Sequence, residues 1–179
     1  MTLKQPAAGA DQTGSANDQH AQEQRREAQR QAIFVFQATL PEVTVLGSVL
    51  HALLYGHLDE ELASQVELGA IEALTNIVRH GYAGRSDGQL ELQYRENADR
   101  LELELIDTGS PIPAGKLELA DQHVFDFDPN DLGNLPEHGM GLSLIRALFD
   151  NVEYHSAEGR NRMLLTKYLT RRRANSGDG

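Results

Sequence analysis

The chain contains no cysteine among its 179 residues. Disulfide bonds and thiolate metal sites are therefore excluded, and nothing in the composition indicates an oxidising compartment. No apolar run approaches the roughly 20 residues that a membrane-spanning helix needs. The N-terminus also lacks the apolar stretch of a signal peptide. We therefore expect a cytoplasmic protein that makes no contact with a membrane.

Positive charge is also scarce. The chain has 16 lysine and arginine residues against 27 aspartate and glutamate residues, which gives a formal net charge of -11. This balance opposes direct binding to nucleic acid, because phosphate groups favour a basic surface. It suits a protein that binds other proteins, or that binds a nucleotide through a metal ion. The length allows one domain with tails.

Large apolar side chains are nearly absent before Ile33. We therefore expect residues 1–31 to form a disordered N-terminal arm, because they cannot bury enough apolar surface to fold alone. Residues 32–170 are expected to form the folded domain and residues 171–179 a polar tail. Within the domain, residues 33–40 are rich in β-branched and aromatic side chains and predict a strand.

Two helices are predicted next. The first covers residues 42–55, where Val45, Leu46, Val49 and Leu50 fall among apolar positions at helical spacing, and Gly56 follows as a stop.

The second predicted helix covers Glu60 to Gly81. Glu72, Asn76 and His80 recur every four residues along it, so a carboxylate, an amide and an imidazole stand in one row near the edge of the buried face. Taken alone, this row is better explained as a solvated helix flank.

The remaining elements alternate between hairpins and a helix. Residues 89–96 and 99–107 alternate leucine or tyrosine with charged or polar side chains and predict an antiparallel hairpin with one wet face. A long polar stretch over residues 110–137 is typical of a lid. A third helix follows over residues 141–150, and a second hairpin over residues 151–169 closes the domain.

Three short segments carry residues suited to nucleotide chemistry. Gly139 and Gly141 precede or open a helix, where free backbone amides and the helix dipole attract phosphate. Asp107 stands at a strand end beside Gly109, where a carboxylate can accept hydrogen bonds from an exocyclic amine. Asn76 offers an amide oxygen of the hard type that Mg²⁺ accepts. Each segment alone has an ordinary explanation as a loop or turn. Their order and spacing, however, constrain one another.

These segments resemble the motifs of the GHKL ATPase superfamily. Residues 72–76 with His80 are similar to its N-box, residues 107–109 to its first glycine box, and residues 139–142 to its second. The resemblance implies an α/β sandwich, with a mixed, mostly antiparallel sheet covered on one face by three helices. The short chain and the wording EALTNIVRHGY most resemble the anti-sigma-factor serine kinases of bacterial partner switching.

The resemblance implies roles for individual residues. Asn76 would coordinate Mg²⁺ that bridges the ATP phosphates, and Asp107 would bind the adenine amino group, with Gly109 giving room. Glu72 would be the catalytic carboxylate that orients or deprotonates the attacking hydroxyl. The other residues that the resemblance places around the nucleotide are Gly139, Gly141, Leu142 and His80, although His80 could equally serve to hold the helix end.

The implied function is a Mg-ATP-dependent serine/threonine protein kinase. It would phosphorylate an anti-sigma-factor antagonist, sequester a sigma factor and form homodimers. An alternative is a regulatory module that binds ATP and a protein partner without catalysis, but such a module would have no need of Glu72. A detached histidine-kinase catalytic domain ranks last, because no histidine sits on a dimerising helix hairpin within the chain.

Overall fold

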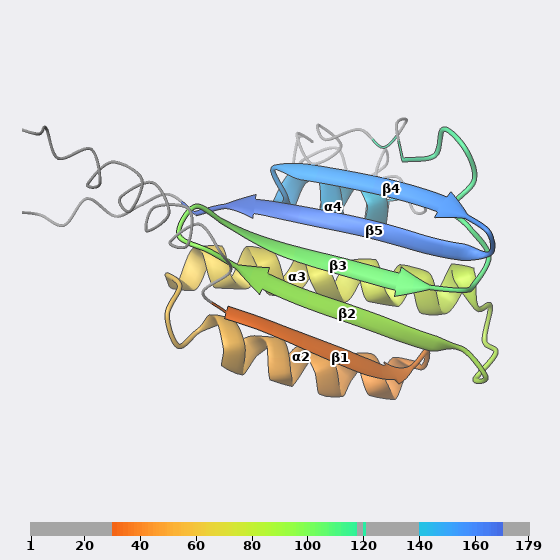
Figure 1. The fold of residues 1–179 in the computed structure, drawn as a ribbon, viewed down its shortest axis with the longest axis horizontal. Helices are drawn as coiled ribbons and strands as arrows, with labels where there is room; N and C mark the ends of the chain where they lie inside the picture. The colour runs from red at the N-terminus through yellow and green to blue at the C-terminus, as the bar shows by residue number, and fades with distance from the viewer. Residues whose placement is uncertain (1–29, 118–119, 121–139, 170–179) are drawn as a thin grey trace, which may run out of the picture.

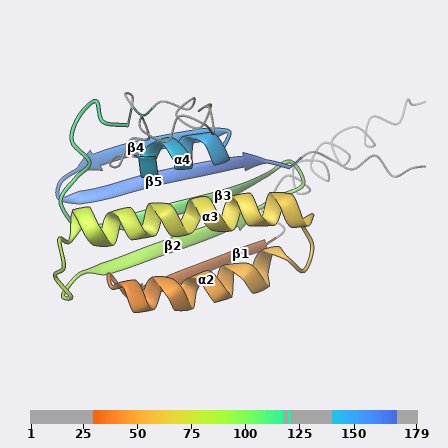
Figure 2. The ribbon, with the colours of Figure 1, turned by 180° about the vertical axis from the view of Figure 1, so that it is seen from behind.

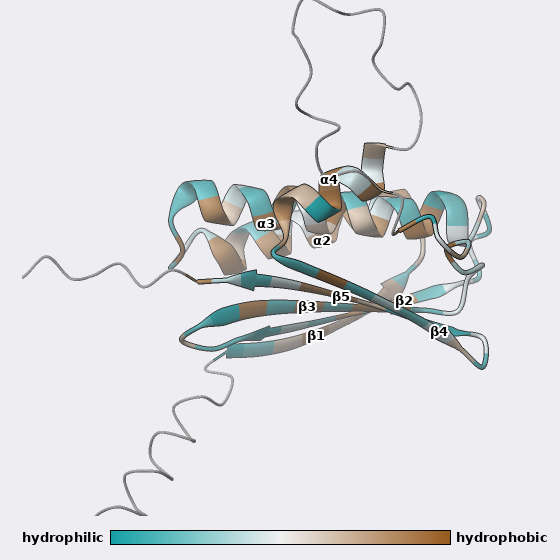
Figure 3. Cartoon of the chain, turned by 90° about the horizontal axis from the view of Figure 1, so that it is seen from above, coloured by the Kyte–Doolittle hydropathy of each residue, from teal (hydrophilic) through white to brown (hydrophobic). Residues whose placement is uncertain are grey.

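The computed structural model describes residues 30–117, 120 and 140–169. They form two layers, a five-stranded sheet and three α-helices that all lie on one face of it (Figures 1 and 3). The elements in chain order are β1 (Arg30–Gln37), α2 (Leu40–Leu54), α3 (Glu60–Asn76), a π-helix η1 (Ile77–Gly81), β2 (Gln89–Glu96), β3 (Arg100–Asp107), α4 (Met140–Leu148), β4 (Asn151–Ala157) and β5 (Arg160–Tyr168).

The strand order is β1-β2-β3-β5-β4, and every pairing between neighbours is antiparallel. This confirms the predicted α/β sandwich with a mostly antiparallel sheet. The described strands include no parallel pair, so the mixed character that the resemblance implied is not seen in them. Helix α3 lies between α2 and α4 on the sheet (Figure 2).

The core lies between the sheet and the helices. Alternation along β2 and β3 turns Leu90, Leu92, Leu101, Leu103 and Leu105 inward, and all five have an exposed fraction of 0%. Each such leucine contributes about 1.5–3 kcal/mol through the removal of its side chain from water. Both predicted hairpins are confirmed, β2 with β3 and β4 with β5.

Two boundaries differ from the prediction. Strand β1 begins at Arg30, so Arg30 and Gln31 belong to the sheet rather than to the N-terminal arm. It ends at Gln37, and Leu40 is already the first residue of α2. Pro41 explains the early start of the helix, because its fixed φ suits the first turn and its missing N–H has no partner there in any helix.

Helix α2 buries a narrower stripe than its apolar positions indicated. Val45 is 61% exposed and Val49 is 36% exposed, so both lie on the solvent side of the helix. The buried positions of α2 are Val43, Leu46, Gly47, Leu50 and Leu54. The spacing correctly predicted the helix, but it could not choose between two apolar flanks, because only one of them packs against the sheet.

The predicted helix over residues 60–81 changes its hydrogen bonding after Asn76. It starts after Asp59, whose side chain accepts the N–H of Leu62 at 2.9 Å. From Ile77 to Gly81 the backbone is a π-helix, and the N–H of Tyr82 donates to the carbonyl of Ile77 at 3.1 Å. A π-helix has a longer period than an α-helix. The regular four-residue row of polar side chains therefore ends at Asn76.

In the part of the chain that the structure describes, no helix has the length and apolar character that crossing a bilayer requires. The predicted N-terminal arm up to residue 29, most of the predicted lid and the tail over residues 171–179 lie outside the described residues.

Candidate active site

The polar end of α3 meets the first turn of α4. A methyl group added at Gly141 would overlap Oε1 of Glu72 and would lie 2.6 Å from Nδ2 of Asn76. Any side chain at this position would therefore displace both polar groups. The absence of a side chain at Gly141 lets the first turn of α4 approach the side chains of Glu72 and Asn76 closely. Two of the predicted site segments are thus brought together.

Neither polar side chain is satisfied within the described residues. The Nδ2 atom of Asn76 is buried and has no hydrogen-bond partner there. A buried donor without a partner costs about 1–3 kcal/mol, and native structures keep few of them without a reason. Glu72, which is half-buried, likewise has no hydrogen bond or ion pair within the described part of the chain. A polar ligand with acceptor oxygens would satisfy the amide.

Asp107 is the last residue of β3 and is only 6% exposed. Its Oδ1 accepts the backbone N–H of Gly109 at 2.7 Å and the Nδ2 amide of Asn161 at 2.9 Å. Burial raises the pKa of this carboxyl above its ordinary value, and the hydrogen bonds from Asn161 and Gly109 oppose part of that rise. Both bonds end on one oxygen. Within the described residues, Oδ2 is therefore left as the acceptor for a ligand.

The loop after Asp107 packs directly against the end of the π-helix. A methyl group on Gly109 would lie 2.8 Å from the carbonyl of Gly81, so the two backbones touch at this point. The N–H of Ser110 donates to the same carbonyl at 2.8 Å. Asn76 is the residue that directly precedes this π-helix. Segment 72–81 therefore contacts both Gly141 and the Asp107 loop, and it joins the three predicted motifs into one site.

Two residues of this framework were missed by the sequence analysis. Asn161 is 2% exposed, and besides Asp107 its amide also donates to the carbonyl of Gly109 at 3.0 Å. It occupies an inward position of β5, two residues before Met163, and this inward position of a polar residue was the available signal. The sequence analysis predicted the hairpin over residues 151–169 but gave Asn161 no role.

The second missed residue is Tyr82, which is 2% exposed. Its hydroxyl donates to the carbonyl of Gln89 at 2.8 Å and accepts the N–H of Thr108 at 3.1 Å. Gly88 gives it room, because a methyl group there would overlap the ring. Tyr82 thereby ties the end of η1 to the residue that follows Asp107.

Other predicted site residues are not brought into this contact. His80 is exposed and makes no hydrogen bond within the described residues. Leu142 is half-buried and packs against the hydrophobic core. Gly139 lies outside the described residues. Hollows of about 650 and 460 Å³ lie between α2 and α3 and beside β4. Neither is lined by Glu72, Asn76 or Asp107. The roles of all these residues remain predictions.

Comparisons with known proteins agree with the motifs. Residues 36–167 match the family described as the histidine kinase-like ATPase domain. The serine-protein kinase RsbW of Listeria monocytogenes is 30% identical over 110 residues, which cover 61% of this chain and 68% of that protein. The kinase of the same name from Bacillus cereus is 34% identical over 107 residues, which cover 59% of this chain and 64% of the relative.

A solved structure has the same fold. The RsbU and RsbW domains of a Mycobacterium tuberculosis protein match 79% of this chain with a TM-score of 0.53 and 16% identity, over 33% of that longer chain. At this identity the likeness supports the fold alone. The sequence comparisons confirm the predicted family and enzyme class, and an ATPase domain implies the use of ATP. We conclude that the chain belongs to the histidine kinase-like ATPase family, in the branch of the serine-protein kinases.

Proposed function

We propose that the chain transfers the γ-phosphoryl group of Mg-ATP to a serine or threonine of an anti-sigma-factor antagonist, and that it sequesters a sigma factor when this antagonist is absent. The observation that carries the proposal is the contact at Gly141, where Glu72 and the unsatisfied amide of Asn76 face the start of α4. Phosphate oxygens are the acceptors that such a donor and such a helix start attract.

The donor set fits a magnesium nucleotide. Within the described residues, no cluster of histidine, cysteine, aspartate or glutamate could hold a metal ion by itself. Mg²⁺ in nucleotide enzymes is held by one or two protein oxygens together with phosphate oxygens and water. Asn76 would supply the protein oxygen, and the ion would neutralise charge on the phosphates during transfer. Gly139 and Gly141 would offer backbone amides to the same phosphates.

Asp107 would read the base. Its Oδ1 already accepts two hydrogen bonds, so Oδ2 is available to accept the amino group of adenine. Guanine carries a carbonyl oxygen at the corresponding position, which would face the carboxylate with no proton between them. Gly109 approaches the backbone of Gly81 closely beside this carboxylate and adds no side chain there. The site would therefore favour ATP over GTP.

Glu72 would act on the acceptor hydroxyl. It lies one helical turn before Asn76, and no cation within the described residues pairs with its carboxylate. A carboxylate held beside the phosphates can orient a serine hydroxyl and take its proton. The relatives are named serine-protein kinases, which supports this role. The antagonist, the sequestered sigma factor and the homodimer that the resemblance implies are part of the same proposal.

Intact-mass spectrometry tests the proposal. The chain is incubated with Mg-ATP and the product of a neighbouring gene, and both proteins are weighed. We expect the partner to gain one phosphoryl group. We expect Glu72→Gln to bind ATP without transferring phosphate, whereas Glu60→Gln, on the first turn of the same helix, keeps full activity. Undiminished transfer by Glu72→Gln would refute the proposed base. ATP binding without transfer to any candidate protein would instead favour the non-catalytic module.

A further inference from the structure

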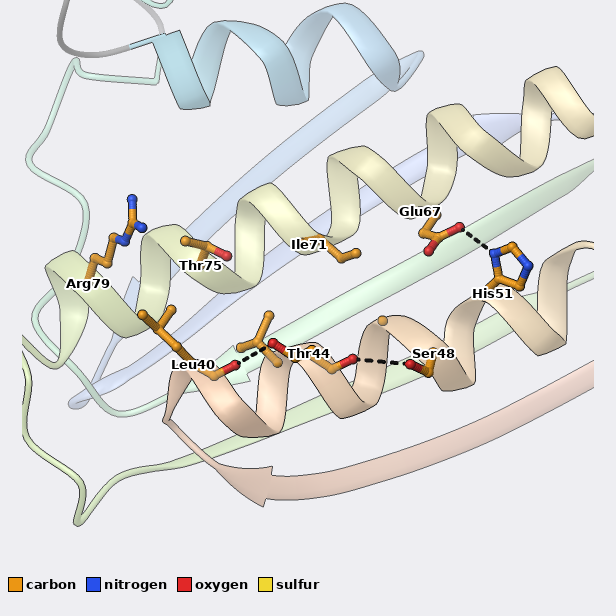
Figure 4. A pocket seen from close by; sticks show the side chains of 10 residues that line it. Leu40, Thr44, Ser48, His51, Glu67, Ile71, Thr75 and Arg79 are labelled. Atoms are coloured by element: carbon orange, nitrogen blue, oxygen red, sulfur yellow. Dashed lines mark hydrogen bonds and ion pairs between the residues drawn. The ribbon is translucent and has the colours of Figure 1, made fainter.

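A hollow of about 650 Å³ separates the outward sides of α2 and α3 (Figure 4). It lies on the flank of α3 that faces α2, whereas the candidate active site lies on the flank that meets α4 (Figure 2). Gly47 and Ile71 form its floor, because a methyl group on Gly47 would come within 3.0 Å of Cδ1 of Ile71. The two helices thus approach closely at the floor and leave the hollow open above it.

The hydroxyl groups on the α2 wall of this groove need no polar partner. The hydroxyl of Thr44 donates to the carbonyl of Leu40 at 3.1 Å, and the hydroxyl of Ser48 donates to the carbonyl of Thr44 at 3.4 Å. Both donors are therefore used within α2 itself. Ile71 and the 42% exposed Leu40 add apolar surface. The α2 wall and the floor of the groove can consequently cover an apolar side chain at no cost in lost hydrogen bonds.

The two ends of the groove differ in charge. At one end Glu67 contacts Nδ1 of His51 at 3.1 Å, and the imidazole stacks on the ring of Tyr55 at 4.0 Å. At the other end stands Arg79, which lines the groove, is exposed and has no ion pair within the described residues. An occupant would therefore find a carboxylate that already has a partner at the first end and an unpaired cation at the second.

The groove suits a helix better than an extended peptide. About twelve residues separate Glu67 from Arg79, which at about 1.5 Å per residue corresponds to about 18 Å, or three turns of a helix. An extended peptide needs partners for its backbone N–H and C=O groups. Helices α2 and α3 have used theirs internally, and the hydroxyl groups of Thr44 and Ser48 on the α2 wall are bonded too. A docked helix brings its own backbone hydrogen bonds and needs only an apolar face.

We propose that this groove docks an amphipathic α-helix of a partner protein, with a carboxylate on the helix positioned to meet Arg79. The unpaired guanidinium of Arg79 favours a partner helix with a negative charge. The apolar floor favours burial of the apolar face of that helix. This interaction goes beyond the proposed phosphoryl transfer, because it uses none of the groups placed around the nucleotide. A partner and ATP could then occupy opposite flanks of α3 together.

The test uses a labelled, helix-stapled peptide and the full chain. The peptide has about 14 residues, with leucines at the i, i+4, i+7 and i+11 spacing of one helix face and a glutamate beyond the last leucine. A second peptide carries lysine in place of that glutamate. Fluorescence anisotropy should show micromolar binding of the glutamate peptide. Arg79→Glu should weaken that binding at least about tenfold and should improve binding of the lysine peptide.

Two further variants test whether the peptide binds in this groove. Arg100→Glu makes the same change of charge at the far hairpin and should leave peptide binding unchanged. Ser48→Trp fills the groove while leaving Arg79 in place and should abolish binding, with thermal melting to check that the variant is folded. Binding that neither Arg79→Glu nor Ser48→Trp affects, or no binding up to about 1 mM peptide, would overturn the proposal.

Two more measurements separate the remaining outcomes. If sedimentation shows that the chain self-associates and that the peptide dissociates the assembly, the occupant is a second copy and the proposal of a different partner fails. ATP binding by Arg79→Glu and peptide binding by Glu72→Gln should both equal those of the unchanged chain. The groove and the nucleotide site can thus fail independently.

Discussion

Asp107 is held in one orientation by two neighbours. The Gly109 N–H and the Asn161 amide both donate to Oδ1, and Asn161 also donates to the carbonyl of Gly109. The carboxyl is buried, so its charged form gains from these two donors and loses from desolvation, and burial has the larger effect on its pKa. The carboxylate that we propose to read the base is therefore fixed before any ligand arrives.

This burial makes a pH-dependent prediction. The folded-state pKa of Asp107 is raised above its ordinary value of 3.8, so the protonated form is the one that the fold favours. The stability that this carboxyl contributes is fully present below about pH 3.8 and is lost as the pH rises through the folded-state pKa. Compared with Asp107→Asn, which does not titrate, the unchanged chain should therefore gain stability as the pH falls from 7 towards 4.

Urea unfolding at a series of pH values checks this expectation. The quantity of interest is the free energy of unfolding of the unchanged chain minus that of Asp107→Asn. Asp87→Asn, at an exposed aspartate in the loop before β2, is the matched control. A difference that stays flat or shrinks on acidification would show that Asp107 is not the buried group described here.

At the scale of residues, the sequence indicated candidate site residues that belong to a motif. It missed residues that come close to them only in the folded chain. Glu72, Asn76 and Asp107 were predicted as site residues because their spacing to glycines matches a known order. Asn161 comes more than 50 residues after Asp107 in the chain, and the two meet only because β3 and β5 pair in this register. No local pattern contains that pairing.

The continuous helix formed by α3 and η1 is the element that organises the site. Its α-helical part ends at Asn76 and its π-helical part at Gly81. The first part contacts Gly141 on α4, and the second contacts Gly109 after β3. Gly69, further back on the same helix, packs on the ring of Phe149, where a methyl group would lie 2.6 Å from the ring. Helix α4 thus packs closely on α3 at two glycines. Gly141 lies in the first turn of α4, and Gly69 of α3 contacts Phe149 just after the last turn of α4.

Substitution of one of these glycines tests the element contact. Gly141→Ala should weaken ATP binding at least about tenfold, or about 1.4 kcal/mol, because the new methyl group must displace Glu72 and Asn76. Isothermal titration with ATP measures the effect. Gly56→Ala is the control, because its methyl group would meet nothing closer than 3.9 Å. Equal ATP affinity in Gly141→Ala and the unchanged chain would exclude Gly141 from the site.

The elements themselves were largely predictable, with one physical exception. Alternation and turn residues predicted both hairpins, since one face of each strand must be buried. The switch to a π-helix at Ile77 was not predictable, because residues 77–81 include ordinary helix formers and the switch depends on tertiary contacts. Among these are the contacts of Gly81 with the backbone of Gly109 and Ser110. The exposure of Val45 and Val49 was missed for a similar reason.

At the scale of the whole molecule, the two sites that we propose lie on opposite flanks of the central helix α3. The face of the sheet that points away from the helices carries ion pairs, among them those of Glu104 with Arg95 and Arg162. The formal charge of -11 makes the approach of an anionic nucleotide unfavourable unless a cation accompanies it. This global balance favours a nucleotide that arrives with its metal ion, whereas the unsatisfied Nδ2 donor of Asn76 favours a ligand with acceptor oxygens such as a phosphate.

Ligand-induced stabilisation tests that dependence in the intact chain. At an ATP concentration of about 100 times Kd with excess Mg²⁺, the folded state should gain about 2.7 kcal/mol, which for a chain of this size is a rise in Tm of roughly 5–10 °C. Chelation of the metal with EDTA should remove most of this rise, because the phosphates would then meet an acidic protein without their counter-ion. GTP should raise Tm less than ATP, because Oδ2 of Asp107 would accept a hydrogen bond from the amino group of adenine. Guanine has a carbonyl oxygen at that position and offers no such donor. Differential scanning fluorimetry measures all three conditions. Gly141→Ala, whose ATP affinity we expect to be at least about tenfold lower, should show no more than about half of the rise of the unchanged chain in Mg-ATP. A full rise in the presence of EDTA would refute the metal dependence, and an equal rise with GTP would refute the role of Asp107 in base selection while leaving the phosphate contacts intact.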